Sequence, residues 1–133
     1  MDRTGWVILG AIAAGSALGG VARHLLTEAV VRVAGAGFPW GTLLVNVSGS
    51  LAIGVMTALA GLAMPGSWPP VWRHAAITGL LGGFTTFSTF SVQTVALLQQ
   101  GLFAAAMGNA ALSLVLGIGA CWAGFALVSA LSR

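Results

Sequence analysis

The sequence predicts an all-α membrane protein with four transmembrane helices in one domain, residues 1–133. Charged residues make up only 5% of the chain and hydrophobic residues 58%, whereas soluble domains carry about 25% charged residues. No charged side chain lies between Arg32 and Arg73, or between Arg73 and Arg133. Because a bilayer-spanning helix needs about 20 apolar residues, the first interval holds one span and the second holds two.

Turns rich in glycine, proline and glutamine separate the four predicted helices. We expect helices at residues 5–33, 40–64, 72–99 and 102–131, with turns at 35–39, 65–70 and 99–101. The first helix is expected to be a retained span and not a cleaved signal peptide, because everything after it is also apolar. Four spans place both termini on the same side of the membrane.

The few arginines are almost balanced across the membrane in this arrangement. One side carries Arg3, Arg73 and Arg133, and the other carries Arg32 and Arg23. The positive-inside rule reads such an excess as orientation. Because the excess is small, we expect insertion in both orientations and an antiparallel dimer.

The third predicted helix contains an unusual stretch at residues 79–91, in which paired glycines precede a run of Thr and Ser. These residues are poor helix formers, and Gly82 and Gly83 lower the cost of leaving helical geometry. We therefore expect a break near the middle of this span, which would free carbonyl groups that can hold ions. A glycine kink filled by Ser and Thr back-bonding is the alternative.

Aromatic and polar residues share one side of the same helix. Phe84, Phe87 and Phe90 recur every three residues, and hydroxyl residues lie between them. The edge of a phenylalanine ring carries partial positive charge. Such edges could line the path of an anion without a fixed cation to trap it, although most phenylalanine stripes serve packing alone.

Polar residues also recur at four-residue spacing on the second and fourth helices, which places each set on one face. These sets are Thr42, Asn46 and Ser50, and Asn109 and Ser113. An asparagine in lipid often only holds helices together. Arg23 has two interpretations, a side chain that snorkels to the interface and a charge that attracts anions.

Several function classes find no support in the sequence. Asp2 and Glu28 are the only carboxylates, and no catalytic set or phosphate loop is visible, so an enzyme is not expected. The single Cys121 excludes a multi-cysteine metal site. The arginines are scattered, so nucleic-acid binding is not expected.

Two segments closely resemble the Fluc (CrcB) fluoride channel family: Gly41 to Ser50, and Gly82 to Phe90. The four-helix layout and the chain length match this family as well. The resemblance implies a passive, fluoride-selective channel in the bacterial inner membrane that exports fluoride and gives resistance to its toxicity. It also implies an antiparallel homodimer with two pores, surrounded by membrane lipid.

The resemblance further implies the residues of the site. The pore residues would be Phe87, Phe90, Asn46, Thr42, Ser113 and Arg23. A structural sodium ion at the dimer centre would be held by the backbone carbonyls of Gly82 and Thr85. Asn109 stands where some relatives carry a tyrosine hydroxyl.

Two other classes of membrane protein remain open from the residues alone. A small four-helix multidrug exporter needs a carboxylate within its first span, and the only candidate, Glu28, lies near the helix end. A non-transporting membrane assembly subunit would explain the many glycines as helix packing, but it would not explain the polar strips.

Overall fold

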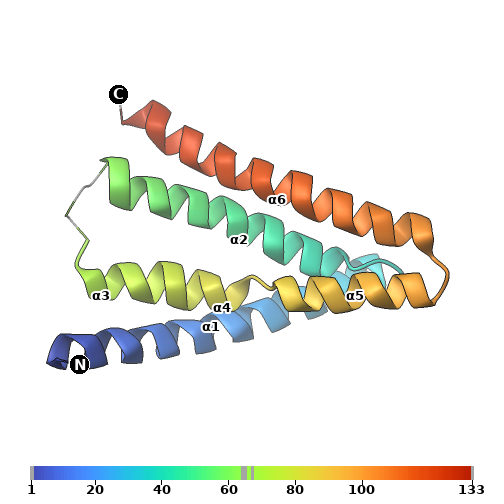
Figure 1. Cartoon of the computed structure of the whole chain (residues 1–133), viewed down its shortest axis with the longest axis horizontal. Helices are drawn as coiled ribbons and strands as arrows, with labels where there is room; N and C mark the ends of the chain where they lie inside the picture. Colours follow the sequence, from blue (N-terminus) through green and yellow to red (C-terminus); the bar gives the residue numbers. More distant parts are fainter. Residues whose placement is uncertain (1, 64–65, 67, 133) are drawn as a thin grey trace.

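The computed structural model describes residues 2–63, 66 and 68–132, and every regular element in this part of the chain is helical. Four helical segments there are long and apolar enough to cross a membrane, as predicted. They are Arg3–Ala34, Trp40–Gly61, Pro70–Gln99 and Phe103–Leu131. The first segment begins and the last one ends at the same end of the bundle (Figure 1).

The second and third segments are not uniform α-helices. The elements in chain order are α1 (Arg3–Ala34), α2 (Trp40–Ala58), the π-helical η1 (Leu59–Ala63), α3 (Pro70–Arg73), the π-helical η2 (His74–Leu81), α4 (Gly82–Phe84), α5 (Phe87–Gln99) and α6 (Phe103–Leu131). The predicted end of the second helix at Met64, the start of its turn at Pro65, and Arg133 lie outside the described residues.

The helix ends follow from local chemistry. α1 begins at Arg3 because the Asp2 side chain accepts a hydrogen bond from the Gly5 amide at 2.9 Å. Gly35, with a positive φ angle of 79°, ends α1. Gly101, with a φ angle of 75°, ends the turn after α5. Pro70, predicted as part of a loop, starts α3 instead, since proline suits the first helical position.

Close helix packing depends on glycine. A Cβ atom at Gly15 or Gly19 of α1 would overlap the backbone of η2 or α4, and one at Gly83 would overlap the backbone of α1 at Ser16. The same holds where Gly54 of α2 meets α6. Small residues therefore bring the backbones together, as is common where lipid gives no hydrophobic driving force between helices.

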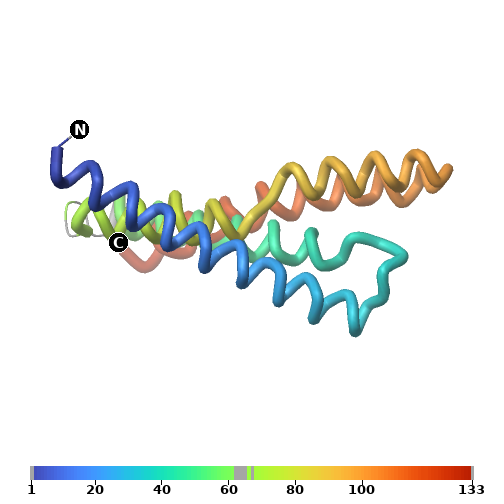
Figure 2. The backbone as a smooth tube through the Cα atoms, turned by 90° about the horizontal axis from the view of Figure 1, so that it is seen from below, coloured from blue at the N-terminus to red at the C-terminus, as the bar shows by residue number. Residues whose placement is uncertain are grey.

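The third span is broken, as predicted, but not at its glycine pair. Gly82 is helical (φ −64°, ψ −37°), whereas Thr85 (φ −77°, ψ 157°) and Thr86 (φ −153°, ψ 113°) are extended. Gly83 stays in α4 because its missing side chain is needed for contact with α1. The break therefore follows the glycines by two residues and lies midway along the span (Figures 1 and 2).

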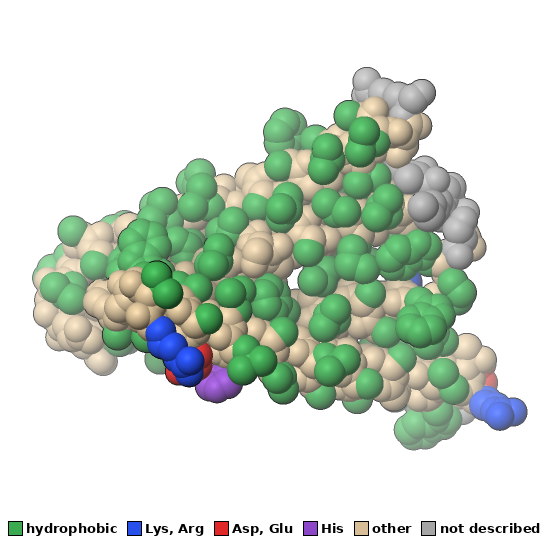
Figure 3. Space-filling view, turned by 180° about the vertical axis from the view of Figure 1, so that it is seen from behind, with side chains coloured by type: hydrophobic (Ala, Val, Ile, Leu, Met, Phe, Trp, Pro, Cys, Tyr) green, Lys and Arg blue, Asp and Glu red, His purple; other side chains and the backbone are tan. Residues whose placement is uncertain are grey.

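The break changes the packing partner of the third span. Before it, η2 and α4 pack on α1, and after it, α5 packs on α6. The second span, α2, also packs on α6. Beyond the break, α5 and the first part of α6 diverge from the end of α1 and the start of α2 (Figure 2). Apolar side chains cover most of the outer face, and charged groups are confined to a few places on it (Figure 3).

Candidate functional site

Asn46 of α2 holds the extended strand of the break in place. Its Oδ1 accepts a hydrogen bond from the Thr86 amide at 2.8 Å, and its Nδ2 donates to the Thr86 carbonyl at 3.0 Å. One amide side chain thus satisfies both backbone groups of a residue that has left the helix. Because Nδ2 carries two N–H groups, one donor of Asn46 remains free for another ligand.

Thr86 also caps the helix that follows. Its Oγ1 accepts from the Thr89 amide at 3.2 Å and lies 3.0 Å from the Thr89 hydroxyl and 3.2 Å from that of Ser88. A threonine at the N-cap of α5 satisfies one of the free amides at this helix start. The sequence Thr-Thr-Phe-Ser therefore favours a helix restart at Phe87.

A cavity of about 300 Å³ lies between α2, the break and α6. Five residues singled out as site candidates line it: Asn46, Thr85, Phe87, Phe90 and Ser113. Ser50 of the polar strip lines it as well. The cavity thus brings together three helices whose polar strips were recognised separately in the sequence.

Three site candidates lie outside the lining of this cavity. Thr42 is buried, with 4% of its surface exposed, one turn before Asn46 on α2. Gly82 is exposed at the start of α4. Arg23 of α1 does not line the cavity but contacts Thr85, which does.

Arg23 reaches the break through the backbone. Its guanidinium Nη1 donates a hydrogen bond to the Thr85 carbonyl at 3.3 Å, and its side chain is half-buried. The positive charge is therefore directed toward the middle of the bundle, so interfacial snorkelling does not describe it. Within the described residues this arginine has no carboxylate partner.

The phenylalanine stripe is divided by the break. Phe87 and Phe90 face each other with ring centroids 5.4 Å apart and ring planes tilted by 47°. Phe84 lies before the break and packs next to Gly49 of α2. The expectation of one continuous stripe was therefore wrong for Phe84, because the extended residues between it and Phe87 turn it to a different neighbour.

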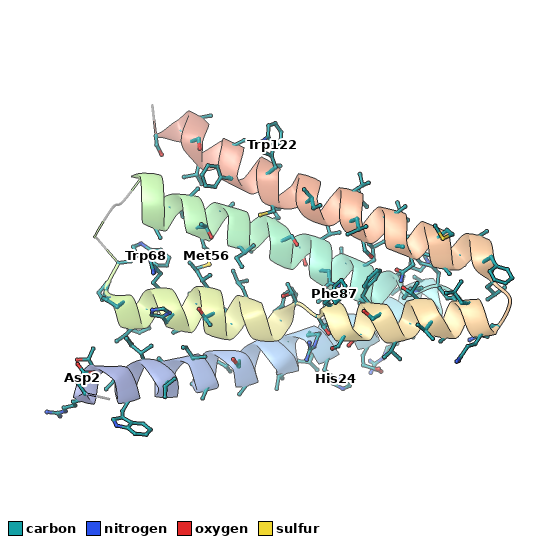
Figure 4. The ribbon with its side chains drawn as sticks, viewed as in Figure 1. Asp2, His24, Met56, Trp68, Phe87 and Trp122 are labelled. Atoms are coloured by element: carbon teal, nitrogen blue, oxygen red, sulfur yellow. The ribbon has the colours of Figure 1, made fainter. Side chains whose placement is uncertain are left out.

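Phe87 is the first residue of α5 and is 75% exposed in the single chain (Figure 4). The next two residues, Ser88 and Thr89, are exposed as well, although their hydroxyls lie within hydrogen-bond distance of Thr86 Oγ1. Three exposed residues thus lie at the start of α5 next to the cavity.

The serine hydroxyls of this cavity differ in their hydrogen bonding from hydroxyls elsewhere in the bundle. Thr94 and Ser129 donate to the carbonyl one turn earlier, as helix hydroxyls often do. Among the described residues, Ser50 and Ser113 have no such partner, although both line the cavity. Their O–H groups are free to point at a ligand.

Asn109 is buried and joins two helices through a hydrogen bond. It is 1% exposed, and its Nδ2 donates to the Thr94 hydroxyl at 2.8 Å. The Thr94 hydroxyl in turn donates to the Phe90 carbonyl at 2.8 Å. This chain joins α6 to α5 behind Phe90, so Asn109 fixes the position of a cavity wall without lining the cavity.

The remaining wall is apolar and was not predicted. Ile53, Leu114 and Gly117 form this wall, and Thr86 of the break also lines the cavity. The Ser50 hydroxyl lies beside Gly117. Helical spacing from Asn46 and Ser113 could have indicated Ile53 and Gly117, since seven and four residues return to the same face.

The chemistry of the cavity favours a small anion. It offers the free N–H of Asn46, the hydroxyls of Ser50 and Ser113, and the rings of Phe87 and Phe90. Neither carboxylate lines it, and no group of three His, Cys, Asp or Glu side chains that could hold a metal occurs in the described residues. Hydrogen-bond donors attract anions, and no carboxylate is present here to repel them.

Comparison with known proteins identifies relatives along nearly the whole chain. The family described as "CrcB-like protein, Camphor Resistance (CrcB)" matches residues 10–125. A fluoride-specific ion channel FluC of Vibrio cholerae is 45% identical over 122 residues, which cover 90% of this chain and 94% of the relative. The FluC protein of Nitrobacter winogradskyi is 44% identical over 123 residues, covering 92% and 96%. That of Bordetella petrii is 52% identical over 105 residues, covering 79% and 78%.

These matches include α2, the broken third span and most of α6, which together form the cavity. The match is much too long and too similar to rest on shared membrane composition alone. The chain therefore belongs to the CrcB family.

Proposed function

We propose that this multi-pass membrane protein is a passive, fluoride-selective ion channel that releases fluoride from the cytoplasm and so protects the cell from its toxicity. The observation that carries the proposal is the donor-lined cavity at the helix break, which contains no carboxylate. The relatives named as fluoride-specific channels support the identity of the ion. No enzyme activity is needed for this function.

The cavity residues have distinct roles in the proposal. The free N–H of Asn46 and the hydroxyl of Ser113 donate to the ion, while the edges of Phe87 and Phe90 accompany it along the wall. Thr42 continues the polar face of α2 beyond Asn46. Arg23 supplies a positive charge near the break that attracts the anion without binding it in the cavity.

Purified protein in liposomes tests this function directly. Vesicles loaded with fluoride should release it when a potassium ionophore removes the charge imbalance, and vesicles loaded with chloride should not. Equal release of both ions, or no release of either, would overturn the assignment. Protein-free vesicles give the background leak.

Proton-coupled export of organic molecules has no support in this structure. Glu28, the one carboxylate of the first span, is exposed in the last two turns of α1. It lies outside the cavity and outside the middle of the bundle, where an exporter exchanges protons for substrate.

We also propose an antiparallel homodimer in the lipid bilayer. Extended backbone at membrane depth is tolerated only inside protein or beside water, yet Gly82, Phe87 and Ser88 around the break are exposed in the single chain. A second copy that covers this face would remove the conflict. Because Arg23 lies at the break and not at an end, the described arginines at the ends are Arg3 and Arg73 on one side and Arg32 on the other. This excess is small, so the orientation signal is weak, which supports an antiparallel arrangement.

Orientation and cross-linking test the dimer. Reporter tags at either terminus should be found on both sides of the membrane, and a cysteine at Ser88 should cross-link two chains. Tags found only in the cytoplasm would contradict the antiparallel arrangement.

A structural sodium ion fits the freed carbonyls of the break. The Thr86 amide, which would bond to the Gly82 carbonyl in a helix, donates to Asn46 instead. The Thr89 amide, which would bond to the Thr85 carbonyl, donates to the Thr86 hydroxyl. The two carbonyls that the resemblance implied, those of Gly82 and Thr85, are thus both without their helical partners.

Because no carboxylate lies nearby, a monovalent cation suits these oxygens better than a divalent one. The bound ion would satisfy carbonyls that are costly to leave bare in an apolar environment. Arg23 contacts one of the same carbonyls, and a carbonyl oxygen has two lone pairs, so both cations can be accommodated.

A further inference from the structure

A second polar hollow lies between the end of α2 and the start of the third span, far from the helix break along both segments. Its volume is about 340 Å³, and its polar lining consists of Thr57, Arg73, His74 and Thr78. Its lining residues come from α2, η1, α3 and η2, and the α2–η1 and α3–η2 parts lie at the end of the bundle where α1 begins (Figure 1). Met56 lies in the same interval between the two segments (Figure 4).

The hollow continues the polar face of α2. Thr57 follows Ser50 by seven residues, which is almost two full helical turns, so both lie on one face. Ile53 lines the first cavity, and Thr57, one turn later, lines the second. One apolar residue thus separates two polar hollows on the same helix face.

The polar groups of this hollow are free to bind. Within the described part of the chain, the hydroxyls of Thr57 and Thr78 make no hydrogen bond to a carbonyl one turn earlier, unlike those of Thr94 and Ser129. Arg73 and His74 have no carboxylate partner there either, because Asp2 caps α1 and Glu28 lies at its far end. The lining therefore combines donors and positive charge without a negative one.

The backbone around the hollow is unusual as well. It is bordered by two π-helical segments, Leu59–Ala63 and His74–Leu81. π-Helical turns are rare and occur frequently at functional sites. Their presence on both sides of one polar hollow is an independent reason to regard it as more than a packing defect.

We propose that the hollow lined by Thr57, Arg73, His74 and Thr78 is an anion-attracting vestibule, joined to the donor-lined cavity along the polar face of α2. Arg73 supplies the attracting charge at the membrane surface, and the two threonine hydroxyls lie on the way inward. Its use as an entrance or exit for the transported ion rests on the proposed fluoride conduction. The attraction of small anions does not.

Thiol accessibility tests the vestibule independently of transport. Thr57→Cys is made in a Cys121→Ala background and placed in phosphatidylcholine vesicles. It is then treated with anionic or cationic methanethiosulfonate reagents of similar size. The control is Leu127→Cys in the same background. Leu127 is exposed near the end of α6, beyond Gly124, and does not line the hollow.

The anionic reagent should react faster than the cationic one at position 57. Relative to the control, the rate ratio should be about tenfold or more, as expected for a surface potential of several kT. Arg73→Gln should reduce the ratio to that of the control, and Arg3→Gln, at the same end of the bundle but outside the hollow, should leave it unchanged. No reaction at position 57, a ratio equal to the control, or a ratio unaffected by Arg73→Gln would overturn the proposal.

A lipid phosphate group is the other anion that could occupy the hollow. In that case, adding phosphatidylglycerol to the vesicles would remove the faster reaction of position 57 with the anionic reagent, relative to the control, and would overturn the proposal. An open vestibule keeps this faster reaction. Fluoride efflux from vesicles with the wild-type chain separates the two proposals. Absent efflux with an intact reagent preference refutes the fluoride channel alone, and normal efflux without the preference refutes the vestibule alone.

Discussion

Removal of the Asn46 side chain tests whether one amide holds the helix break. Asn46→Ala leaves the Thr86 N–H and C=O without the partners that now lie 2.8 and 3.0 Å away. Thr86 is only 7% exposed, so water reaches these groups poorly.

Two reference values bracket the size of the effect. Side-chain hydrogen bonds within membrane proteins contribute about 0.6 kcal/mol on average, which gives about 1 kcal/mol for the pair. A buried backbone group left unsatisfied costs about 1–3 kcal/mol, which gives about 2–6 kcal/mol. Because the cavity beside Thr86 can admit some water, we expect a loss of about 2 kcal/mol, between these limits.

The matched control is Asn109→Ala. Asn109 is also buried, but its one hydrogen bond goes to the side chain of Thr94 and not to unpaired backbone. We therefore expect a smaller loss of about 1 kcal/mol and continued fluoride efflux. Asn46→Asp keeps the acceptor for the Thr86 amide but places an oxygen against the Thr86 carbonyl. Like Asn46→Ala, it should therefore lose fluoride efflux.

Unfolding of the protein in detergent, followed by circular dichroism, measures stability, and efflux from liposomes measures function. Asn46→Ala should lower stability more than Asn109→Ala and should reduce efflux at least tenfold. Equal stability losses in the two variants, together with normal efflux in Asn46→Ala, would show that the break is held by other contacts.

Three further predictions follow from the same structure. Phe87→Ile and Phe90→Ile should each reduce fluoride efflux at least tenfold while the circular dichroism spectrum stays helical, because each removes one of the two rings whose centroids lie 5.4 Å apart at the cavity. Normal efflux in both variants would place the ion path on another face. Gly19→Ala should destabilise the bundle by about 1–3 kcal/mol or more through overlap with the η2–α4 backbone, whereas Gly20→Ala, which has open space around it, should change the detergent unfolding midpoint little; equal effects would refute the close-packing argument. Replacing sodium with N-methyl-D-glucamine throughout purification should lower the thermal stability of the protein in detergent, and added sodium should restore it; an unchanged melting temperature would argue against the bound ion.

The sequence alone determined the fold class and the outline of the site. Long charge-free intervals leave no solution other than spanning helices, because lipid demands internal hydrogen bonds for every backbone group. Four-residue spacing correctly placed Asn46 and Ser50 on one face. The run of glycine, threonine and serine correctly indicated a broken span, since local propensity is strongest where several poor helix formers coincide.

Only the tertiary structure decided where the chain leaves the helix and what each polar group does there. Gly83 stays helical because it is needed against Ser16, and Thr86 leaves the helix because Asn46, forty residues earlier, replaces its lost partners. Asn46 and Asn109 look alike in the sequence, yet one clamps backbone at the cavity and the other joins two helices behind it. Such roles depend on which groups meet across helices, and local sequence does not encode the distances between helices that lie far apart in the chain.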